Sequence, residues 1–271
     1  MHENYNGPLR FSLEDIQFDT ENFDDKHCVG KGGVGKIYEG KLPKGYHTIV
    51  AKLFDVKGGQ GDKQFQNELQ ILSKYKHNNI ISLVGYCAEK DAKIIVYEYA
   101  SRGSLDRYLD DARLDWKTRL TICIDAAIAL VFLHRAFRND AITLIHRDIK
   151  TASILLNDKW KAKLANFGLS LIKDRDTDYA IDNVCCTKGY VDPVYLKSGF
   201  LTKESDINSF GILLFEVLCG RSEYLIHKQE GVSLPSFVKH SFDNGKLDEV
   251  VFEKIKNQTW SSVLTDFYTI A

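Results

Sequence analysis

The sequence lacks the features that mark membrane, repeat and secreted proteins. Its longest apolar run, FGILLFEVLCG, is interrupted by Glu216 and is too short to cross a bilayer. The N-terminus has no charged segment followed by an apolar one, as a secretory signal would have, and no internal repeat or low-complexity tract occurs. We therefore expect no membrane span in this chain, and a location in the cytoplasm or nucleus.

The chain also lacks an excess of charge of either sign. The 36 Lys and Arg residues are balanced by 37 Asp and Glu residues, which leaves a formal net charge of -1. Long-range attraction to nucleic acid or to an acidic membrane requires an imbalance or a dense basic patch. The charge balance therefore gives no reason to expect a nucleic-acid partner.

The cysteines form no disulfide framework or metal motif. The 6 cysteines are scattered, without a C-x-x-C pair and without histidines at zinc spacing, in a chain large enough to need no staples. We interpret them as reduced thiols. The adjacent pair Cys185 and Cys186 leaves two interpretations open, a redox switch or ordinary core and loop packing, and the second is favoured.

The composition indicates an ordinary globular protein with two lobes. Hydrophobic residues make up 44% and charged residues 27% of the chain, enough to bury a sizeable core as one large domain or two lobes. Residues 29 to 99 have the pattern of strands with one helix, whereas later segments are mostly helical. Between them lies a linker of small residues at Ser101 to Ser104, which we interpret as a hinge.

One helix of the first part carries an inward carboxylate. Helical spacing places Phe65, Leu69 and Leu72 on one face, and Glu68 lies on the same face. Burying a carboxylate without a partner is costly. The sequence therefore predicts a lysine close to Glu68.

Two helices form the scaffold of the second part. Residues 115 to 136 begin at a capping residue, Asp115, and the apolar residues expected on the buried face are Leu120, Cys123, Ile124, Ala127, Leu130 and Val131. Residues 205 to 220 are apolar nearly all round and stop at Gly220, which predicts a buried central helix.

A glycine-rich segment and a lysine are the first candidates for chemistry. Gly30, Gly32 and Gly35 form G-x-G-x-x-G, in which backbone N–H groups can approach phosphates closely. A structural turn between strands is an equal alternative, and a dinucleotide site would need a helix where a strand follows instead. Lys52 lies in a β-branched run and is either solvated or the cation that Glu68 requires.

Together the glycine segment, Lys52 and Glu68 resemble a protein kinase. Further motifs follow in the expected order: HRDIK resembles the catalytic loop, NFG stands where D-F-G normally falls, GYVDPVY resembles the end of the activation segment, and SDINSFG resembles the start of the central helix. The segments NIISLVGYC, IVYEYASRGSLDRYL and LDWKTRL are similar to the plant receptor-like kinase family, which comprises Ser/Thr kinase domains.

This resemblance implies an α+β, bilobal protein-kinase fold. The implied domains are an N-terminal extension (1–20), a β-rich N-lobe with one main helix (21–98), a hinge (99–104) and a mostly helical C-lobe (105–271) that is truncated at its C-terminal end.

The resemblance also assigns roles to individual positions. Asp148 would accept the proton of the substrate hydroxyl, with Lys150 near the transferred phosphate and with Lys52 and Glu68 completing the catalytic set. Arg147 would pair with a phosphorylated residue, Thr177, Tyr179 or Thr187, or form an ordinary buried salt bridge. Tyr97 would stand at the back of the nucleotide pocket. The implied nucleotide-binding residues are Gly30, Lys31, Gly32, Gly35, Ile37, Val50, Lys52, Tyr97, Glu98, Ala100 and Leu155.

The sequence departs from the family pattern at the two magnesium positions. Asn166 replaces the metal-binding aspartate, and Ser153 stands where the second metal ligand is an asparagine. Magnesium prefers charged or strongly dipolar oxygen ligands, so we expect its binding to be impaired and ATP to be held weakly. Val50 would crowd adenine where alanine is usual, and Val194 replaces a glutamate that anchors the activation segment.

These observations favour a pseudokinase that docks onto an active receptor-like kinase or an immune receptor. The chain would work in the cytoplasm, or at the inner face of the plasma membrane through a partner or a transmembrane region absent from this sequence. One alternative is an active Ser/Thr kinase with unusual metal use, supported by Lys52, Glu68, Asp148 and Lys150. The other is a truncated product that does not fold stably.

Overall fold

A computed structural model describes residues 9–41, 48–89, 91–135, 142–174, 179–181, 187–259 and 261–271 of the chain. The chain divides into two compact units. Unit 1 consists of Met1–Ser101 with Asn166–Leu169, and unit 2 consists of Arg102–Ala165 with Ser170–Ala271. A short stretch of the second half of the sequence therefore belongs to the first unit.

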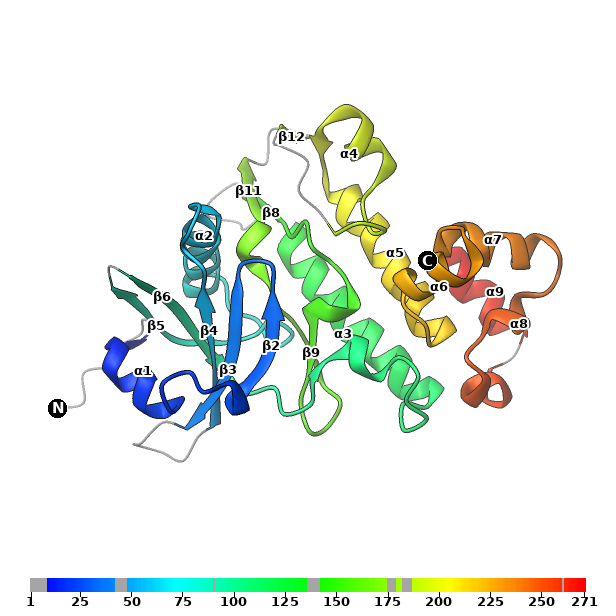
Figure 1. Cartoon of the computed structure of the whole chain (residues 1–271). Coiled ribbons are helices and arrows are strands. Elements are labelled where there is room, and N and C mark those ends of the chain that lie inside the picture. The colour runs from blue at the N-terminus through cyan, green and yellow to red at the C-terminus, as the bar shows by residue number, and fades with distance from the viewer. Residues whose placement is uncertain are drawn as a thin grey trace. The chain divides into compact units, whose positions relative to one another are not determined.

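Unit 1 is built on a six-stranded sheet in the order β1-β5-β6-β4-β3-β2 (Figure 1). All neighbouring strands are antiparallel except β1 and β5, which pair in parallel. The strands are β1 (Leu9–Arg10), β2 (Cys28–Gly32), β3 (Gly35–Lys41), β4 (Thr48–Phe54), β5 (Leu83–Glu89) and β6 (Ala92–Glu98).

Helices cover this sheet and close its core. Helix α1 (Leu13–Asp19) begins at a capping box formed by Ser12 and Asp15, and its Ile16 is buried in the sheet core with Ile49, Ala51, Cys87, Ile94 and Val96. Helix α2 (Gln60–Lys74) packs against β4, β5 and β6. The remaining elements are two short 3₁₀ turns, η1 (Asp25–His27) and η4 (Phe167–Leu169).

The described residues of unit 2 are mostly helical, with small sheets of two or three strands (Figure 1). Its helices are α3 (Trp116–His134), α4 (Pro193–Ser198), α5 (Lys203–Cys219), α6 (Glu223–Glu230), α7 (Leu234–Asp243), α8 (Leu247–Val250) and α9 (Ser261–Ile270). The strands and 3₁₀ turns are β7 (Gly103–Ser104), η2 (Leu105–Tyr108), β8 (Ile142–Ile145), η3 (Thr151–Ser153), β9 (Ile154–Leu156), β10 (Ala162–Leu164), β11 (Leu171–Asp174), β12 (Ala180–Ile181), β13 (Phe200–Leu201) and η5 (Glu253–Gln258). The α+β class predicted from the sequence, with a β-rich first part and a helical second part, is confirmed.

Helix α5 is the buried central helix that the sequence predicts. Residues Gly211 to Cys219 are all buried, and the helix ends at Gly220, whose φ of 65° is in the left-handed region that favours glycine. Even so, in the described ranges no helix has the length and apolar character needed to cross a membrane.

The buried face of α3 differs from the predicted one. Cys123 and Leu130 are buried, but Ile124 is 57% and Val131 is 50% exposed, so those two predictions were wrong. The buried side instead carries Ile122, Ala126, Ala129 and Leu133. The error has a simple cause: the helix is apolar nearly all round, so its sequence contains no polar face to fix which side is inward.

The four described cysteines support the prediction of reduced thiols. Cys28, Cys87, Cys123 and Cys219 are free, and burial raises the pKa of Cys123 and Cys219 to about 12. Such thiols are nearly always protonated near neutral pH and react poorly. Cys185 and Cys186 lie outside the described residues.

The predicted cap of α3 is present and gives a test of local stability. The side chain of Asp115 accepts a hydrogen bond of 2.8 Å from Thr118 N–H, and its carboxyl pKa is lowered by hydrogen bonding to the side chain and then to the backbone of Thr118. We expect Asp115→Ala to reduce the free energy of unfolding by about 1 kcal/mol and Asp115→Asn to retain most of it. A carboxyl with a lowered pKa stabilises the fold above its unfolded pKa, so the advantage of Asp115 over asparagine should shrink as the pH falls below 3.8. Urea unfolding at two pH values measures both effects, and equal stability of the alanine variant would contradict the cap.

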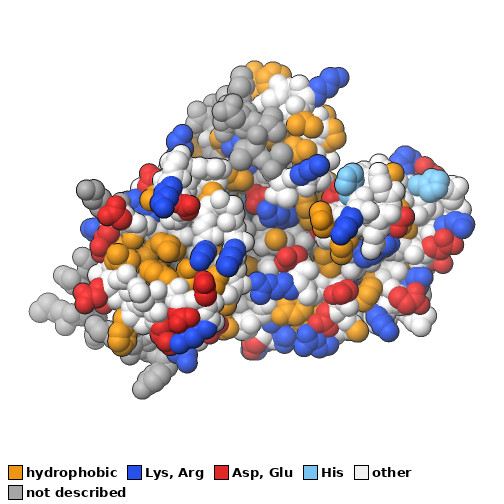
Figure 2. Space-filling view, in the orientation of Figure 1, with side chains coloured by type: hydrophobic (Ala, Val, Ile, Leu, Met, Phe, Trp, Pro, Cys, Tyr) orange, Lys and Arg blue, Asp and Glu red, His pale blue; other side chains and the backbone are white. Residues whose placement is uncertain are grey.

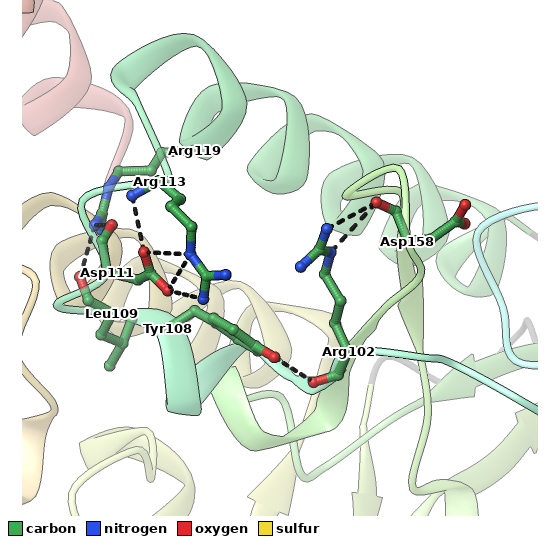
Figure 3. Close-up of polar contacts among 7 residues, drawn as sticks. All are labelled: Arg102, Tyr108, Leu109, Asp111, Arg113, Arg119 and Asp158. Atoms are coloured by element: carbon green, nitrogen blue, oxygen red, sulfur yellow. Dashed lines mark hydrogen bonds and ion pairs between the residues drawn. The ribbon is translucent and has the colours of Figure 1, made fainter.

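A buried arginine joins α3 to the segment before it and to α5, and Figure 3 shows its contact with Leu109. Arg119 is 1% exposed, and its guanidinium donates hydrogen bonds to the carbonyl oxygens of Leu114, Val217 and Leu109 at 2.9, 2.8 and 2.7 Å. Burial lowers the pKa of Arg119 to about 10, which still leaves it charged near neutral pH. Backbone carbonyls thus solvate this cation inside unit 2.

Candidate active site

Lys52 and Glu68 form the ion pair that the sequence predicts. Lys52, on β4, places its Nζ 2.8 Å from Glu68 Oε2, on α2. The side chain of Glu68 is 1% exposed and that of Lys52 is 10% exposed. The second carboxylate oxygen of Glu68 accepts a 3.2 Å hydrogen bond from Phe167 N–H. Both oxygens of this buried carboxylate are therefore paired, as burial requires.

Asn166 lies beside this pair in unit 1. Its Oδ1 accepts a 3.4 Å hydrogen bond from Lys52 Nζ, and its φ of 70° is a left-handed value that asparagine tolerates better than most residues. From α2, Asn67 Nδ2 donates to the carbonyls of Phe167 and Gly168 at 3.1 Å each. The NFG turn is thus held to the helix that carries Glu68.

The glycine-rich segment forms the hairpin of β2 and β3, with no helix at its end. A Cβ on Gly35 would lie 2.1 Å from the carbonyl oxygen of Leu53, so packing against β4 requires this glycine. Gly32 and Gly33 meet no such obstacle. Lys31 is exposed on the hairpin, and half-buried Ile37 faces Gly30. Packing between strands therefore explains the glycine at position 35. The exposed Gly32 and Gly33 have no such packing requirement and leave space for a ligand.

The predicted adenine-side residues lie on β4 and β6. Val50 is directly opposite Tyr97 in the sheet and points to the same side of β4 as Lys52, whereas Ala51 is fully buried on the other side. Burial and the neighbouring charge of Glu68 raise the pKa of Tyr97 well above its usual range. The backbone N–H of Glu98 donates to Ser82 O at 3.1 Å, and Ala100 is half-buried in the segment that follows β6.

In unit 2, Asp148 and Lys150 form a compact network with Thr187. Lys150 Nζ lies 2.9 Å from Asp148 Oδ1 and donates to Thr187 Oγ1 at 2.7 Å. Thr187 Oγ1 in turn donates to Asp148 Oδ1 at 2.7 Å. Thr187 was predicted only as a phosphorylation candidate. Its contact with Asp148 was not predicted, because 39 residues separate the two in the sequence.

The backbone before Asp148 is held by a buried carboxylate on α5. Asp206 accepts hydrogen bonds of 2.8 Å from the N–H groups of both His146 and Arg147, and its Oδ2 lies 2.9 Å from His134 Nε2. Arg147 has a φ of 70°, rare for a non-glycine residue. The two charge-assisted hydrogen bonds from these consecutive N–H groups to Asp206 offset the energetic cost of this backbone conformation. The guanidinium of Arg147 donates to the Tyr195 hydroxyl at 3.1 Å.

The buried carboxylate of Glu216 was not predicted from the sequence. Glu216 is 1% exposed in α5, accepts hydrogen bonds of 2.6 Å from Thr151 Oγ1 and from Glu223 N–H, and has a pKa raised by burial. It connects the loop after Lys150 to the start of α6. The available signal was the single charged residue of the apolar stretch FGILLFEVLCG, which was interpreted only as an interruption.

The two predicted metal positions lie in different units. Ser153 is fully buried in unit 2, and its Oγ donates to the carbonyl of Asp148 at 2.7 Å. Asn166 in unit 1 offers only a neutral amide oxygen. Leu155 is half-buried on β9, where it pairs with Lys163 and Ser104 in the small sheet.

The end of the activation segment presents apolar side chains to solvent. Val194, where the resemblance expects an anchoring glutamate, is 68% exposed on α4, with Leu196 and Phe200 also exposed. Figure 2 shows hydrophobic side chains gathered over α4. The ring of Tyr179 packs on Phe200 with a centroid distance of 4.3 Å. Thr177 and Cys186 lie outside the described residues.

This combination of a hairpin of glycines, a buried lysine–glutamate pair and an aspartate–lysine network defines the protein kinase class. A sequence model of the family "protein tyrosine and serine/threonine kinase" matches residues 23–255. The chain belongs to this family, whose members generally use ATP and magnesium.

Relatives of this chain include plant receptor-like kinases from Arabidopsis thaliana. Receptor-like protein kinase FERONIA is 38% identical over 253 residues, covering 92% of this chain and 28% of that relative. Receptor-like protein kinase ANXUR1 is 36% identical, covering 95% of this chain and 30% of the relative. G-type lectin S-receptor-like serine/threonine-protein kinase SD2-5 is 37% identical, covering 94% and 31%. The chain thus spans less than a third of the length of these three relatives.

Proposed function

We propose that this chain is a receptor-like-kinase-type pseudokinase domain, which holds ATP weakly and acts as a scaffold or allosteric partner in signalling. One observation carries the proposal: both magnesium positions have lost their usual ligand together. Asn166 offers a neutral amide whose oxygen is 3.4 Å from Lys52 Nζ, and Ser153 offers a short, buried hydroxyl that donates to its own loop. Such a pair does not suit magnesium, which prefers anionic oxygen ligands.

The loss of the carboxylate is the more serious of the two changes. Phosphoryl transfer depends on metal ions that bridge the phosphates and neutralise developing charge. Removing one preorganised electrostatic group costs about 3 to 4 kcal/mol of transition-state stabilisation, or roughly 10² to 10³ in rate. Two such losses would reduce turnover far below the usual range for kinases.

The retained scaffold supports a role in protein binding. The fold keeps the ion pair between Lys52 and Glu68 and the hydrogen bonds from the backbone before Asp148 to Asp206. It also exposes the apolar side chain of Val194. By analogy with the receptor-like kinase relatives, the partner would be an active receptor-like kinase or an immune receptor. We place the chain in the cytoplasm or at the inner face of the plasma membrane, with lobes at 21–98 and 105–271 joined by a hinge at 99–104.

An active serine/threonine kinase is the second candidate. The network of Asp148, Lys150 and Thr187 favours it, because the carboxylate that would accept a hydroxyl proton is present and positioned. In this reading an amide oxygen and the phosphates themselves would hold the metal.

Phosphate transfer from ATP separates the two candidates. The purified chain and its Asp148→Asn variant are incubated with labelled ATP, magnesium and a general protein substrate, and label incorporation is measured. We expect the two proteins to be indistinguishable. Incorporation by the unmodified chain at more than ten times the rate of Asp148→Asn would establish the active kinase instead.

A further inference from the structure

The charges around Lys52 differ from those of a site built for magnesium. Lys52 contributes one positive charge and Glu68 one negative charge, and both oxygens of Glu68 are engaged, one by Lys52 Nζ at 2.8 Å and one by Phe167 N–H at 3.2 Å. The third member, Asn166, is neutral and accepts from the same ammonium at 3.4 Å. The formal charge of this trio is therefore zero.

An aspartate at position 166 would change this sum to minus one. A nucleoside triphosphate carries about four negative charges, so a carboxylate next to its phosphates is tolerable only when a cation lies between them. A unit charge at roughly 5 Å in a partly solvated site changes binding by about ten- to a hundredfold. The neutral amide removes this repulsion and with it much of the need for a divalent ion.

Two further features of unit 1 suit a free polyanion. The β2–β3 hairpin carries Lys31 exposed to solvent, which adds a positive charge that the trio does not cancel. Gly33 has open space where a Cβ would stand, and Gly32 has only the Gly35 carbonyl oxygen at 3.9 Å, so no side chain at this turn obstructs the approach of phosphate oxygens. Lys36 is less available, since it lies 3.3 Å from Asp25.

We infer that this part of unit 1 binds a nucleoside triphosphate as the free anion, without a divalent cation. The inference rests on the proposed function and specifies its ligand: the nucleotide is a metal-free structural ligand rather than a magnesium-bound substrate. The ammonium of Lys52 would attract the phosphates, and the neutral amide of Asn166 beside it would add no negative charge to repel them.

Direct titration tests the inference on the unmodified chain. ATP is titrated into the full chain by calorimetry, once with EDTA and once with excess magnesium. We expect dissociation constants that agree within about threefold. Binding that weakens more than tenfold in EDTA, or that is absent in both buffers, would overturn the inference.

A charge variant with a matched control locates the effect. Asn166→Asp should weaken ATP binding in EDTA by at least tenfold and make it dependent on magnesium, because the restored carboxylate repels the phosphates until a cation neutralises it. Asn257→Asp adds the same charge at an exposed position of unit 2 and should leave both constants unchanged. Thermal melts establish that each variant is folded. Equal metal-free affinity of Asn166→Asp and the unmodified chain would contradict the role of Asn166.

The outcomes also separate this inference from the proposed function. Magnesium-dependent ATP binding without phosphate transfer would overturn the metal-free site and leave the pseudokinase intact. Phosphate transfer that Asp148→Asn abolishes would overturn the pseudokinase itself, whatever the affinities in EDTA.

Discussion

Replacing Asn166 by aspartate and Ser153 by asparagine is expected to raise phosphate transfer by about 10² to 10⁴-fold over the unmodified chain. The aspartate returns an anionic ligand beside Lys52, and the asparagine returns a longer, more strongly dipolar oxygen to the loop of Asp148. The range lies below the product of the two separate effects, because groups that act on one site are seldom additive. Initial rates with labelled ATP and magnesium measure the gain.

Two controls make this result interpretable. Adding Asp148→Asn to the double variant should return the rate to the starting value, since the proton acceptor is then lost. Because Ser153 is fully buried, Asn166→Asp is also measured alone, which avoids introducing a larger side chain into a packed loop. A folded double variant that stays as inactive as the unmodified chain would show that the metal positions are not the main defect.

Replacing Arg119 by methionine is expected to lower the free energy of unfolding of unit 2 by about 4 kcal/mol or more. Methionine fills much of the volume but donates no hydrogen bond, and three buried carbonyl groups would lose their donor at about 1 to 3 kcal/mol each. The stability of Arg119→Lys should lie between those of the unmodified chain and of Arg119→Met, because an ammonium cannot direct donors to three separate carbonyl groups as a guanidinium does.

A neighbouring arginine provides the matched control. Arg113 is 67% exposed and forms an ion pair with Asp111 (Figure 3), and exposed pairs contribute about 0 to 1 kcal/mol. Arg113→Met should therefore change stability little. Of the chain's three tryptophans, Trp116 and Trp160 are described by the structure and lie in unit 2, so urea unfolding followed by tryptophan fluorescence reports on that unit. Equal stability of the two methionine variants would contradict the role assigned to Arg119.

Local patterns predicted the parts of the molecule that depend on neighbours in sequence. The helical period placed Glu68 inward, and the need of a buried carboxylate for a cation identified Lys52 as its partner. The cap at Asp115 and the stop at Gly220 follow from the preferences of single residues at helix ends.

Other features depend on contacts that no local pattern contains. Thr187 forms hydrogen bonds with Asp148 and Lys150, which are distant from it in the sequence. Glu216 accepts hydrogen bonds from the Thr151 hydroxyl and from the backbone N–H of Glu223. The prediction of the buried face of α3 was wrong for a related reason. Where nearly every face of a helix is apolar, the neighbouring segments decide which face is buried, and in α3 they leave Ile124 exposed.

The first described strand, β1, covers part of the outer edge of the unit 1 sheet. β1 pairs in parallel with β5, Leu9 opposite Gly85, and a Cβ on Gly85 would lie 2.3 Å from the carbonyl oxygen of Leu9. Without β1 the outer side of β5 would present unsatisfied backbone groups, which recruit strands from other molecules and seed aggregation. The two residues of β1 therefore cover part of this sheet edge. They can pair with β5 because Gly85 has no side chain that would collide with the carbonyl oxygen of Leu9.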